Sequence, residues 1–209
     1  FVYIGGNDSM DTVHRLSEYF AENGITDIVV NGAPKTIDND LCGIDHCPGF
    51  GSAAKYIATV CSELAREVKV YDKENILIVE IMGRHAGWLT AAAALAAENN
   101  KEVPYLIYLS EVKLSVDKFV ADLKEAMKNS KNVIVALSEG VMIETESGIH
   151  HSSEDEVDAF GHKQMAGKGR ILEKILKDEF KYKARYIELS LLQRCASHCL
   201  SETDITESV

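Results

Sequence analysis

The apolar residues of the chain fall into two kinds of pattern that alternate along its length. Short continuous apolar runs bounded by turn residues are typical of buried strands, and apolar residues three and four positions apart indicate one face of a helix. The sequence therefore predicts strands at 1–4, 27–34, 76–82, 105–111, 132–140 and 184–190, and helices at 9–24, 52–70, 87–100, 115–130 and 168–180.

Strands that are separated by helices require crossover connections, which place the strands parallel and cover both faces of the sheet. We therefore expect the α/β fold class. Ser9 and Ser115 are the expected N-caps of their helices, and Gly24 is the expected end of the first helix. Residues 141–167 lose the periodicity and gather Glu, Ser, His and Gly, so we expect a long loop there.

Composition narrows the classes of partner. The 209 residues carry 22 basic and 33 acidic side chains, a net charge of −11, which argues against non-specific binding of nucleic acid or of anionic lipid. No apolar run reaches the roughly 20 residues that span a bilayer, and the N-terminus lacks the layout of a signal peptide, so we expect a cytoplasmic protein. The strand-like start FVYI has no initiating methionine, and we expect the chain to begin partway through a larger protein.

The five cysteines do not suggest a disulfide framework or a metal centre. Their number is odd, and a chain with 46% hydrophobic residues builds a core without such staples. CGIDHC and CASHC each place a histidine beside two thiols, but neither spacing matches the usual zinc pairs. Local or buried thiols are the better interpretation.

Three polar clusters follow predicted strands: GGNDS (5–9), PKTIDND (34–40) and MGRHAG (82–87). Ligands of a parallel α/β sheet bind beyond the carboxyl ends of its strands, because glycine turns and helix N-termini converge there. We therefore expect the three clusters to share one site.

GGNDS combines a glycine turn with the start of a helix. The backbone at Gly6 can approach an anion closely, and the positive end of the helix favours a phosphate. Asn7 and Asp8 are candidate ligands for Mg²⁺, directly or through its waters. An ordinary turn before a capped helix is the alternative.

PKTIDND brings a cation and two carboxylates together. A carboxylate such as Asp38 can take the proton of a sugar hydroxyl as that hydroxyl attacks phosphorus, with Asp40 as its orienter. Lys35 supplies a mobile charge for phosphate oxygens, and Thr36 is a further candidate for substrate binding. Asp and Asn also form good turns through bonds to nearby backbone amides, which is the alternative.

MGRHAG places Arg84 at the end of a strand. A guanidinium there can hold a phosphate through two hydrogen bonds, although a surface salt bridge is the alternative. His85 has no partner in the sequence that suggests catalysis, and we expect it to be structural or solvated.

Taken in order, GGNDS, PKTIDND, MGRHAGW, SEG near 140 and LLQR near 194 resemble the phosphofructokinases, most closely their pyrophosphate-dependent branch. The resemblance implies that Asp38 is the base for the C1 hydroxyl of fructose 6-phosphate and that Asp40 supports it. Arg84 would stabilise the transferring phosphoryl group, and Met82 and Gly83 would shape the sugar site.

The same resemblance assigns residues farther along the chain. Glu111 matches a glutamate that binds the sugar hydroxyls. Arg194 and Arg185 match arginines that hold the 6-phosphate, with Arg185 reaching into a neighbouring subunit's site, so we expect a homodimer or a homotetramer. Leu191 replaces a histidine of the ATP-using relatives, which puts that contact in doubt.

Two positions bear on the phosphoryl donor. ATP-using members are similar but carry glycine where this chain has Lys35 and Asp8. A lysine stem and a carboxylate would crowd a nucleotide's α-phosphate, whereas the ammonium of Lys35 can neutralise the phosphate that leaves pyrophosphate. Asn7 stands where the magnesium-binding aspartate is usual, so Mg²⁺ would depend on Asp8 or on pyrophosphate itself.

The resemblance implies a donor lobe at 1–48, a fructose 6-phosphate lobe at 49–190 and a return to the first lobe at 191–209. The expected reaction is reversible phosphoryl transfer from pyrophosphate to fructose 6-phosphate, a step of glycolysis. Three alternatives stay open: an ATP-dependent enzyme of the same family, a fragment that binds sugar phosphate without turnover, and a phosphate-binding regulatory module.

Overall fold

The computed structural model describes residues 1–145, 148–150 and 167–208, and its centre is a four-stranded parallel sheet. The strands are β3 (Asn75–Ile81), β4 (Tyr105–Tyr108), β6 (Asn132–Ser138) and β9 (Ala184–Glu188), in the order β4-β6-β3-β9. All three neighbouring pairs are parallel. The predicted α/β class is therefore confirmed. The strand β3 lies between β6 and β9.

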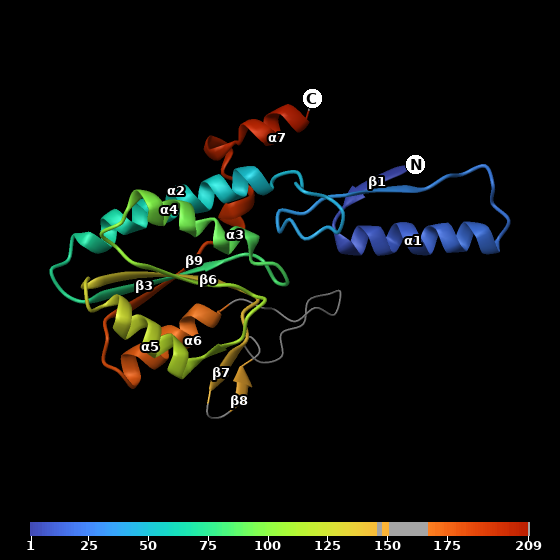
Figure 1. Cartoon of the computed structure of the whole chain (residues 1–209). Coiled ribbons are helices and arrows are strands. Elements are labelled where there is room, and N and C mark those ends of the chain that lie inside the picture. The colour runs from blue at the N-terminus through green and yellow to red at the C-terminus, as the bar shows by residue number, and fades with distance from the viewer. Residues whose placement is uncertain (146–147, 151–166, 209) are drawn as a thin grey trace.

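Helices cover both faces of this sheet (Figure 1). One face carries α2 (Phe50–Lys69), α3 (Trp88–Ala91) and α4 (Ala93–Asn99), and the other carries α5 (Val116–Ala126) and α6 (Lys168–Asp178). The amphipathic spacing explains the packing, because the buried residues of α2 recur three and four positions apart: Ala53, Tyr56, Ile57, Cys61, Ala65 and Val68.

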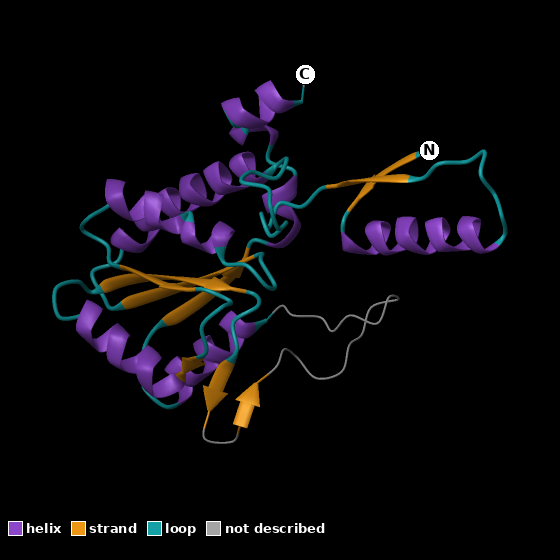
Figure 2. Cartoon of the chain, turned by 45° about the vertical axis from the view of Figure 1, so that its right-hand side comes forward, coloured by secondary structure: helices purple, strands orange, loops and turns teal. Residues whose placement is uncertain are grey.

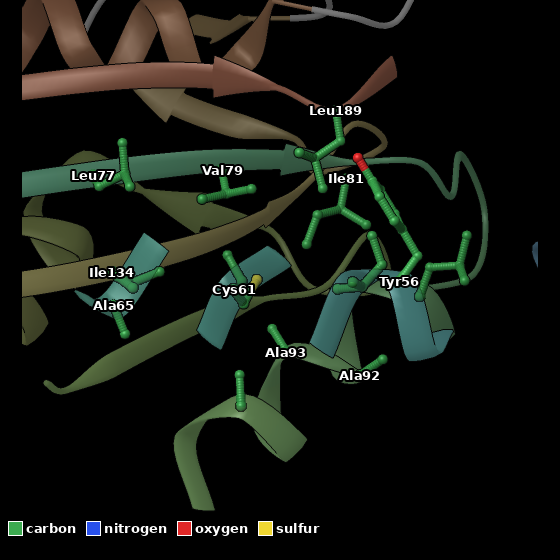
Figure 3. Close-up of a cluster of buried hydrophobic side chains, with 14 of the residues drawn as sticks. Tyr56, Cys61, Ala65, Leu77, Val79, Ile81, Ala92, Ala93, Ile134 and Leu189 are labelled. Carbon is green, nitrogen blue, oxygen red and sulfur yellow. The ribbon is translucent and has the colours of Figure 1, made fainter. Parts of the chain in front are cut away.

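The strand β3 is buried at every residue because its side chains alternate between two cores. Leu77, Val79 and Ile81 pack beneath α2 in the cluster of Figure 3. Ile76 and Ile78 point to the opposite face, where α5 and α6 lie.

The first residues form a separate unit, β1 (Val2–Gly5), α1 (Asn7–Glu22) and β2 (Asn31–Pro34), which projects from the main body (Figures 1 and 2). The two strands are parallel. The helix packs on one face, where a Cβ on Gly32 would lie 2.5 Å from Met10 Sδ. The buried strand predicted at 27–34 is wrong, because β2 begins only at Asn31 and a two-stranded sheet with one helix gives it no second covering layer in the described part of the chain.

Other predicted boundaries shift for local reasons. The first helix begins at Asn7 with Gly6 as its N-cap, so Ser9 is not the cap, whereas Gly24 adopts the left-handed φ of 66° that ends the helix. Ser115 caps α5 as predicted, accepting from the Lys118 amide at 3.2 Å. The helix predicted at 87–100 divides into α3 and α4 around Ala92, whose amide bonds to two carbonyls.

Part of the loop predicted at 141–167 is ordered as strands. A hairpin of β7 (Ile143–Thr145) and β8 (Gly148–His150) forms, and β7 also pairs with β5 (Leu114–Ser115). Residues 146–147 and 151–166 of the predicted loop lie outside the described residues. Within the described ranges, every helix is too short or too polar to cross a membrane.

The tail docks on α2. It comprises two 3-10 turns, η1 (Ser190–Arg194) and η2 (Ser197–Cys199), followed by α7 (Glu202–Glu207). The Asp204 carboxylate accepts from the backbone amides of Gly49 and Ser52 at 2.7 Å each, and so caps the start of α2. His46 Nδ1 lies 2.6 Å from Glu207 Oε2. The tail, which was expected to return to the first lobe, thus contacts α2 and the segment that leads into it.

This cap predicts a measurable loss of stability. Burial raises the pKa of Asp204, but the hydrogen bonds from Ser52, Gly49 and Ser201 outweigh it and lower the pKa below its ordinary value. Asp204→Ala should therefore lower the free energy of unfolding by about 1–3 kcal/mol at pH 7. Because the folded pKa is the lower one, this contribution should disappear as the pH falls through it.

Urea unfolding at pH 7 and at acidic pH checks this prediction. Glu202→Ala is the control, since it removes an exposed carboxylate from the same helix. Equal losses in the two variants at pH 7 would show that Asp204 does not anchor the tail.

Candidate functional site

A cavity of about 340 Å³ lies where the first unit meets the carboxyl ends of β3 and β6. Ten of the predicted site residues line it: Gly6, Asn7, Asp8, Lys35, Thr36, Asp38, Asp40, Met82, Arg84 and Arg194. Ile37, His85 and Glu139 complete the lining. The structure therefore brings residues of all three polar clusters to one cavity.

The glycine turn at the start of α1 supports one wall. The amide of Lys35 donates to the carbonyl of Gly5 at 2.9 Å, which holds the 35–40 segment beside the turn. Gly5 must lack a side chain, because a Cβ there would lie 2.1 Å from Ser9 Oγ. Asn7 and Asp8 occupy the first turn of α1, where the helix dipole favours an anion.

The 35–40 segment contains both a turn and site residues. The amide of Asp38 donates to Thr36 Oγ1 at 3.0 Å, and Asn39 adopts a left-handed φ of 57° while its Oδ1 accepts from the Cys47 amide at 2.8 Å. Asn39 thus has the turn-forming role that the alternative interpretation gave to this motif. Asp38 and Asp40, on either side of it, line the cavity.

The environment of Asp38 suits a general base. Burial raises the pKa of its carboxyl group, and the negative charge of Asp40 raises it further, against the opposing effects of Arg84, His85 and Arg194. A carboxylate whose pKa is raised accepts a proton more readily.

The loop after β3 is fixed by the strand beside it. Gly83 has a φ of 127°, and a Cβ there would lie 2.4 Å from the carbonyl oxygen of Ala86. The Gly83 amide donates to Glu139 Oε1 at 3.3 Å, and Ser138 Oγ donates to the Gly83 carbonyl at 2.6 Å. These bonds fix the backbone next to Arg84, which lines the cavity. Within the described ranges Arg84 forms no ion pair, which argues against the salt-bridge alternative.

Sequence reasoning gave no role to Glu139. Burial raises the pKa of its carboxyl group, the Gly83 bond lowers it, and the charge of Asp38 raises it. The signal that could have identified it is its position directly after the buried strand β6, at the same edge of the sheet as Arg84.

Arg194 reaches the cavity from η1. Its neighbour Gln193 is buried and accepts from the Met82 amide at 3.1 Å, while the Gln193 side-chain amide donates to the Ser190 carbonyl at 3.0 Å. These bonds hold η1 against the end of β3. They explain how a residue more than 100 positions from Arg84 in sequence lines the same cavity.

Three predicted residues are not part of the cavity lining: Gly83, whose backbone supports the loop of Arg84, Glu111 and Arg185. Glu111 accepts from the Gly87 amide at 2.8 Å and from Ser110 Oγ at 3.1 Å, so it supports the start of α3. Arg185 pairs in register with Leu77, five residues before Met82, which is roughly 17 Å along the strand. Its guanidinium lies 5.0 Å from the centre of the Tyr71 ring and cannot reach this chain's cavity.

A larger hollow, about 540 Å³, lies between α5, β7 and α6 but has the wrong charge for a phosphate. Among the described residues, its lining includes Asp117, Glu144 and Glu179 and no basic side chain. The smaller cavity, in contrast, combines three cations with its carboxylates.

The cavity fits a magnesium ion held partly by substrate. Mg²⁺ takes oxygen ligands and is usually bound by one or two side chains together with phosphate oxygens and water. Asn7 and Asp8 offer an amide oxygen and a carboxylate at the cavity wall. In the described part of the chain, the one set of three potential ligands within 4.8 Å of one another is His46, Asp204 and Glu207, outside the cavity.

The family model for phosphofructokinase matches residues 1–202. The chain belongs to the phosphofructokinase family. It is 40% identical over 216 residues to the pyrophosphate–fructose 6-phosphate 1-phosphotransferase of Rhodospirillum rubrum, with all of this chain and 52% of the relative covered. It is 32% identical to the sulfofructose kinase of Alkalicoccus urumqiensis, with 99% of this chain and 52% of the relative covered.

Solved structures agree with this membership of the phosphofructokinase family. The crystal structure of pyrophosphate-dependent phosphofructokinase from Nitrosospira multiformis superposes with a TM-score of 0.79 at 32% identity, covering all of this chain and 48% of that one. This phosphofructokinase chain therefore spans about half the length of the relatives that it matches.

The raised pKa of Asp38 makes a prediction about stability. Because the folded state disfavours the ionised carboxylate, stability falls as the pH rises from the ordinary value of 3.8 through the raised folded value. Asp38→Asn should therefore leave the melting temperature at pH 7 unchanged or raise it. Thermal melts from pH 4 to pH 8 measure this, with the exposed Asp45→Asn as control; a lower melting temperature at pH 7 in Asp38→Asn alone would contradict it.

Proposed function

We propose that the protein acts in reversible phosphoryl transfer between pyrophosphate and the C1 hydroxyl of fructose 6-phosphate, with Mg²⁺. The observation that carries this proposal is the cavity in which Asp38 and three cations, Lys35, Arg84 and Arg194, lie together. The family membership and the names of the relatives support it.

In this proposal Asp38 accepts the proton of the C1 hydroxyl as its oxygen attacks phosphorus. Phosphoryl transfer depends mainly on positioning and on stabilisation of charge, and Arg84 in the cavity lining supplies a guanidinium for the equatorial oxygens. Lys35 faces the leaving phosphate, and Mg²⁺, held through Asn7 and Asp8, neutralises charge on the donor. Arg194 holds the 6-phosphate, and Glu111 stays a proposed contact of the sugar hydroxyls.

Domain roles follow from the same proposal. Residues 1–48 supply the donor side and 49–190 the sugar side, and the cavity lies between them. Arg185 would serve a neighbouring subunit, because it cannot reach the cavity of its own chain. The protein would then be at least a dimer, and light scattering that shows a monomer at working concentration would exclude this role for Arg185.

The first activity prediction concerns the base. Asp38→Asn should lower kcat by roughly 10²- to 10⁴-fold with little change in the KM for fructose 6-phosphate, because it removes the proton acceptor and keeps the shape. A coupled assay with pyrophosphate measures both constants. Asp45→Asn is the control, and an unchanged kcat in Asp38→Asn would remove this residue from the role.

The second activity prediction concerns the phosphoryl donor. Lys35→Met removes the ammonium but keeps the bulk of the side chain, whereas Lys35→Gly removes both. Both variants should lose roughly 10- to 100-fold in kcat/KM for pyrophosphate, the scale of one bond to a charged group. Lys35→Gly combined with Asp8→Gly should gain measurable use of ATP, since the two changes together open the space that a nucleotide needs. An unchanged kcat/KM for pyrophosphate in both variants would contradict the assignment of Lys35 to the phosphoryl donor.

The same assays separate the alternatives. ATP and pyrophosphate offered separately to the wild-type chain distinguish the two branches of the family. Fructose 6-phosphate that binds in calorimetry without turnover would indicate a binding fragment. Sulfofructose is the second acceptor to test, because the relative of that name is similar over nearly the whole chain and a sulfonate would meet the same arginine.

A further inference from the structure

Lys168 is a lysine with no exposed surface, which is rare for an ammonium group unless it is paired. It is the first residue of α6, and its Nζ donates to the carbonyl of Val141 at 2.6 Å. Burial lowers the pKa of this amine, while the charges of Glu80 and Glu139 raise it. A buried amine that interacts electrostatically with two carboxylates, one of which, Glu139, lines the cavity, suggests a role beyond packing.

Glu80 fixes the position of this lysine. It lies in β3, is 1% exposed, and its two carboxylate oxygens accept from the amides of Gly167 and Gly169 at 2.7 Å each. These two amides flank Lys168 in sequence, so one carboxylate fastens the first turn of α6 to the central strand. The backbone on both sides of Lys168 is therefore held in place by Glu80.

Val141, which accepts the hydrogen bond of Lys168, belongs to a turn that contacts the backbone of Arg84. Val141 ends a turn that begins at Ser138, since the Val141 amide donates to the Ser138 carbonyl at 3.1 Å. Ser138 Oγ bonds the Gly83 carbonyl, and a Cβ on Gly140 would lie 1.9 Å from the carbonyl oxygen of Arg84. The turn and the loop that carries Arg84 are thus in direct backbone contact, and a shift of the turn must shift the loop.

We propose that Lys168 is a positioning residue. Its bond to the Val141 carbonyl holds the 138–141 turn against the backbone of Gly83 and Arg84, and this contact fixes the position of the Arg84 guanidinium in the cavity. The proposal rests on the proposed function only for its catalytic consequence. The mechanical consequence, a fixed Gly83–Arg84 backbone, holds whatever the reaction is.

The test compares Lys168→Met with Lys177→Met. The first removes the donor and the charge while keeping the length of the side chain, and the second removes an exposed lysine from the same helix. Amide hydrogen exchange at Gly83 and Gly140, followed by NMR, should accelerate at least roughly 10-fold in Lys168→Met, with other β3 and β6 amides unchanged. Lys177→Met should leave both amides as in the wild type.

Activity is the second readout. Because displacement of a catalytic group by about 1 Å costs on the order of 10²-fold, Lys168→Met should lower kcat for pyrophosphate-dependent turnover 10- to 100-fold with little change in KM. Wild-type protein without turnover would defeat the proposed function, and the exchange data would still decide the positioning role. Lys168→Leu, which also removes the donor and the charge, replaces Lys168→Met if that variant does not fold.

Uniform acceleration of exchange across the sheet would show that Lys168 only stabilises the fold. Unchanged exchange at Gly83 and Gly140 in a folded Lys168→Met or Lys168→Leu variant would overturn the proposal.

Discussion

The parallel pairing of β3 with β6 determines where the chemistry lies. It aligns Ile81 with Ser138, so that both strands end together and their next residues, Met82 to Arg84 and Glu139, emerge at one edge. Hydrogen bonds from Ser138 and to Glu139 then tie the two exits to each other, and Gln193 ties the tail to the same place. If that register slipped, the cations and carboxylates of the cavity would no longer face one another.

The cavity gathers basic side chains although the whole chain is acidic. The chain carries a net charge of −11, yet three cations, Lys35, Arg84 and Arg194, line the cavity together with four carboxylates, Asp8, Asp38, Asp40 and Glu139. Burial raises the pKa values of Asp38 and Glu139, and repulsion from nearby carboxylates raises them further. The cavity therefore combines cations that can pair with an anionic group and carboxylates that take up a proton more readily than an exposed one.

Much of this arrangement was predictable because strand ends and glycine turns are visible in sequence. Asp38 and Arg84 stand beside such signals, and the parallel sheet that unites them follows from the alternation of strands and helices. The place of Glu139 directly after a buried strand was a signal in the sequence, but its bond to the Gly83 amide and the bond of Lys168 to the Val141 carbonyl were not predictable, since both join segments far apart in the chain. The start of β2 only at Asn31 and the exposure of Ile28 and Val29 were missed, because an apolar run such as DIVV is typical of a buried strand but does not show how many layers cover it.

The most direct test of the central claim is a crystal structure with fructose 6-phosphate and a non-hydrolysable pyrophosphate analogue. The account predicts that the C1 hydroxyl of fructose 6-phosphate lies within about 3 Å of the Asp38 carboxylate. It also predicts that the side chains of Arg84 and Lys35 contact the phosphonate oxygens of the analogue. A sugar phosphate bound away from Asp38, or an analogue bound in the acidic hollow beside α5, would contradict it.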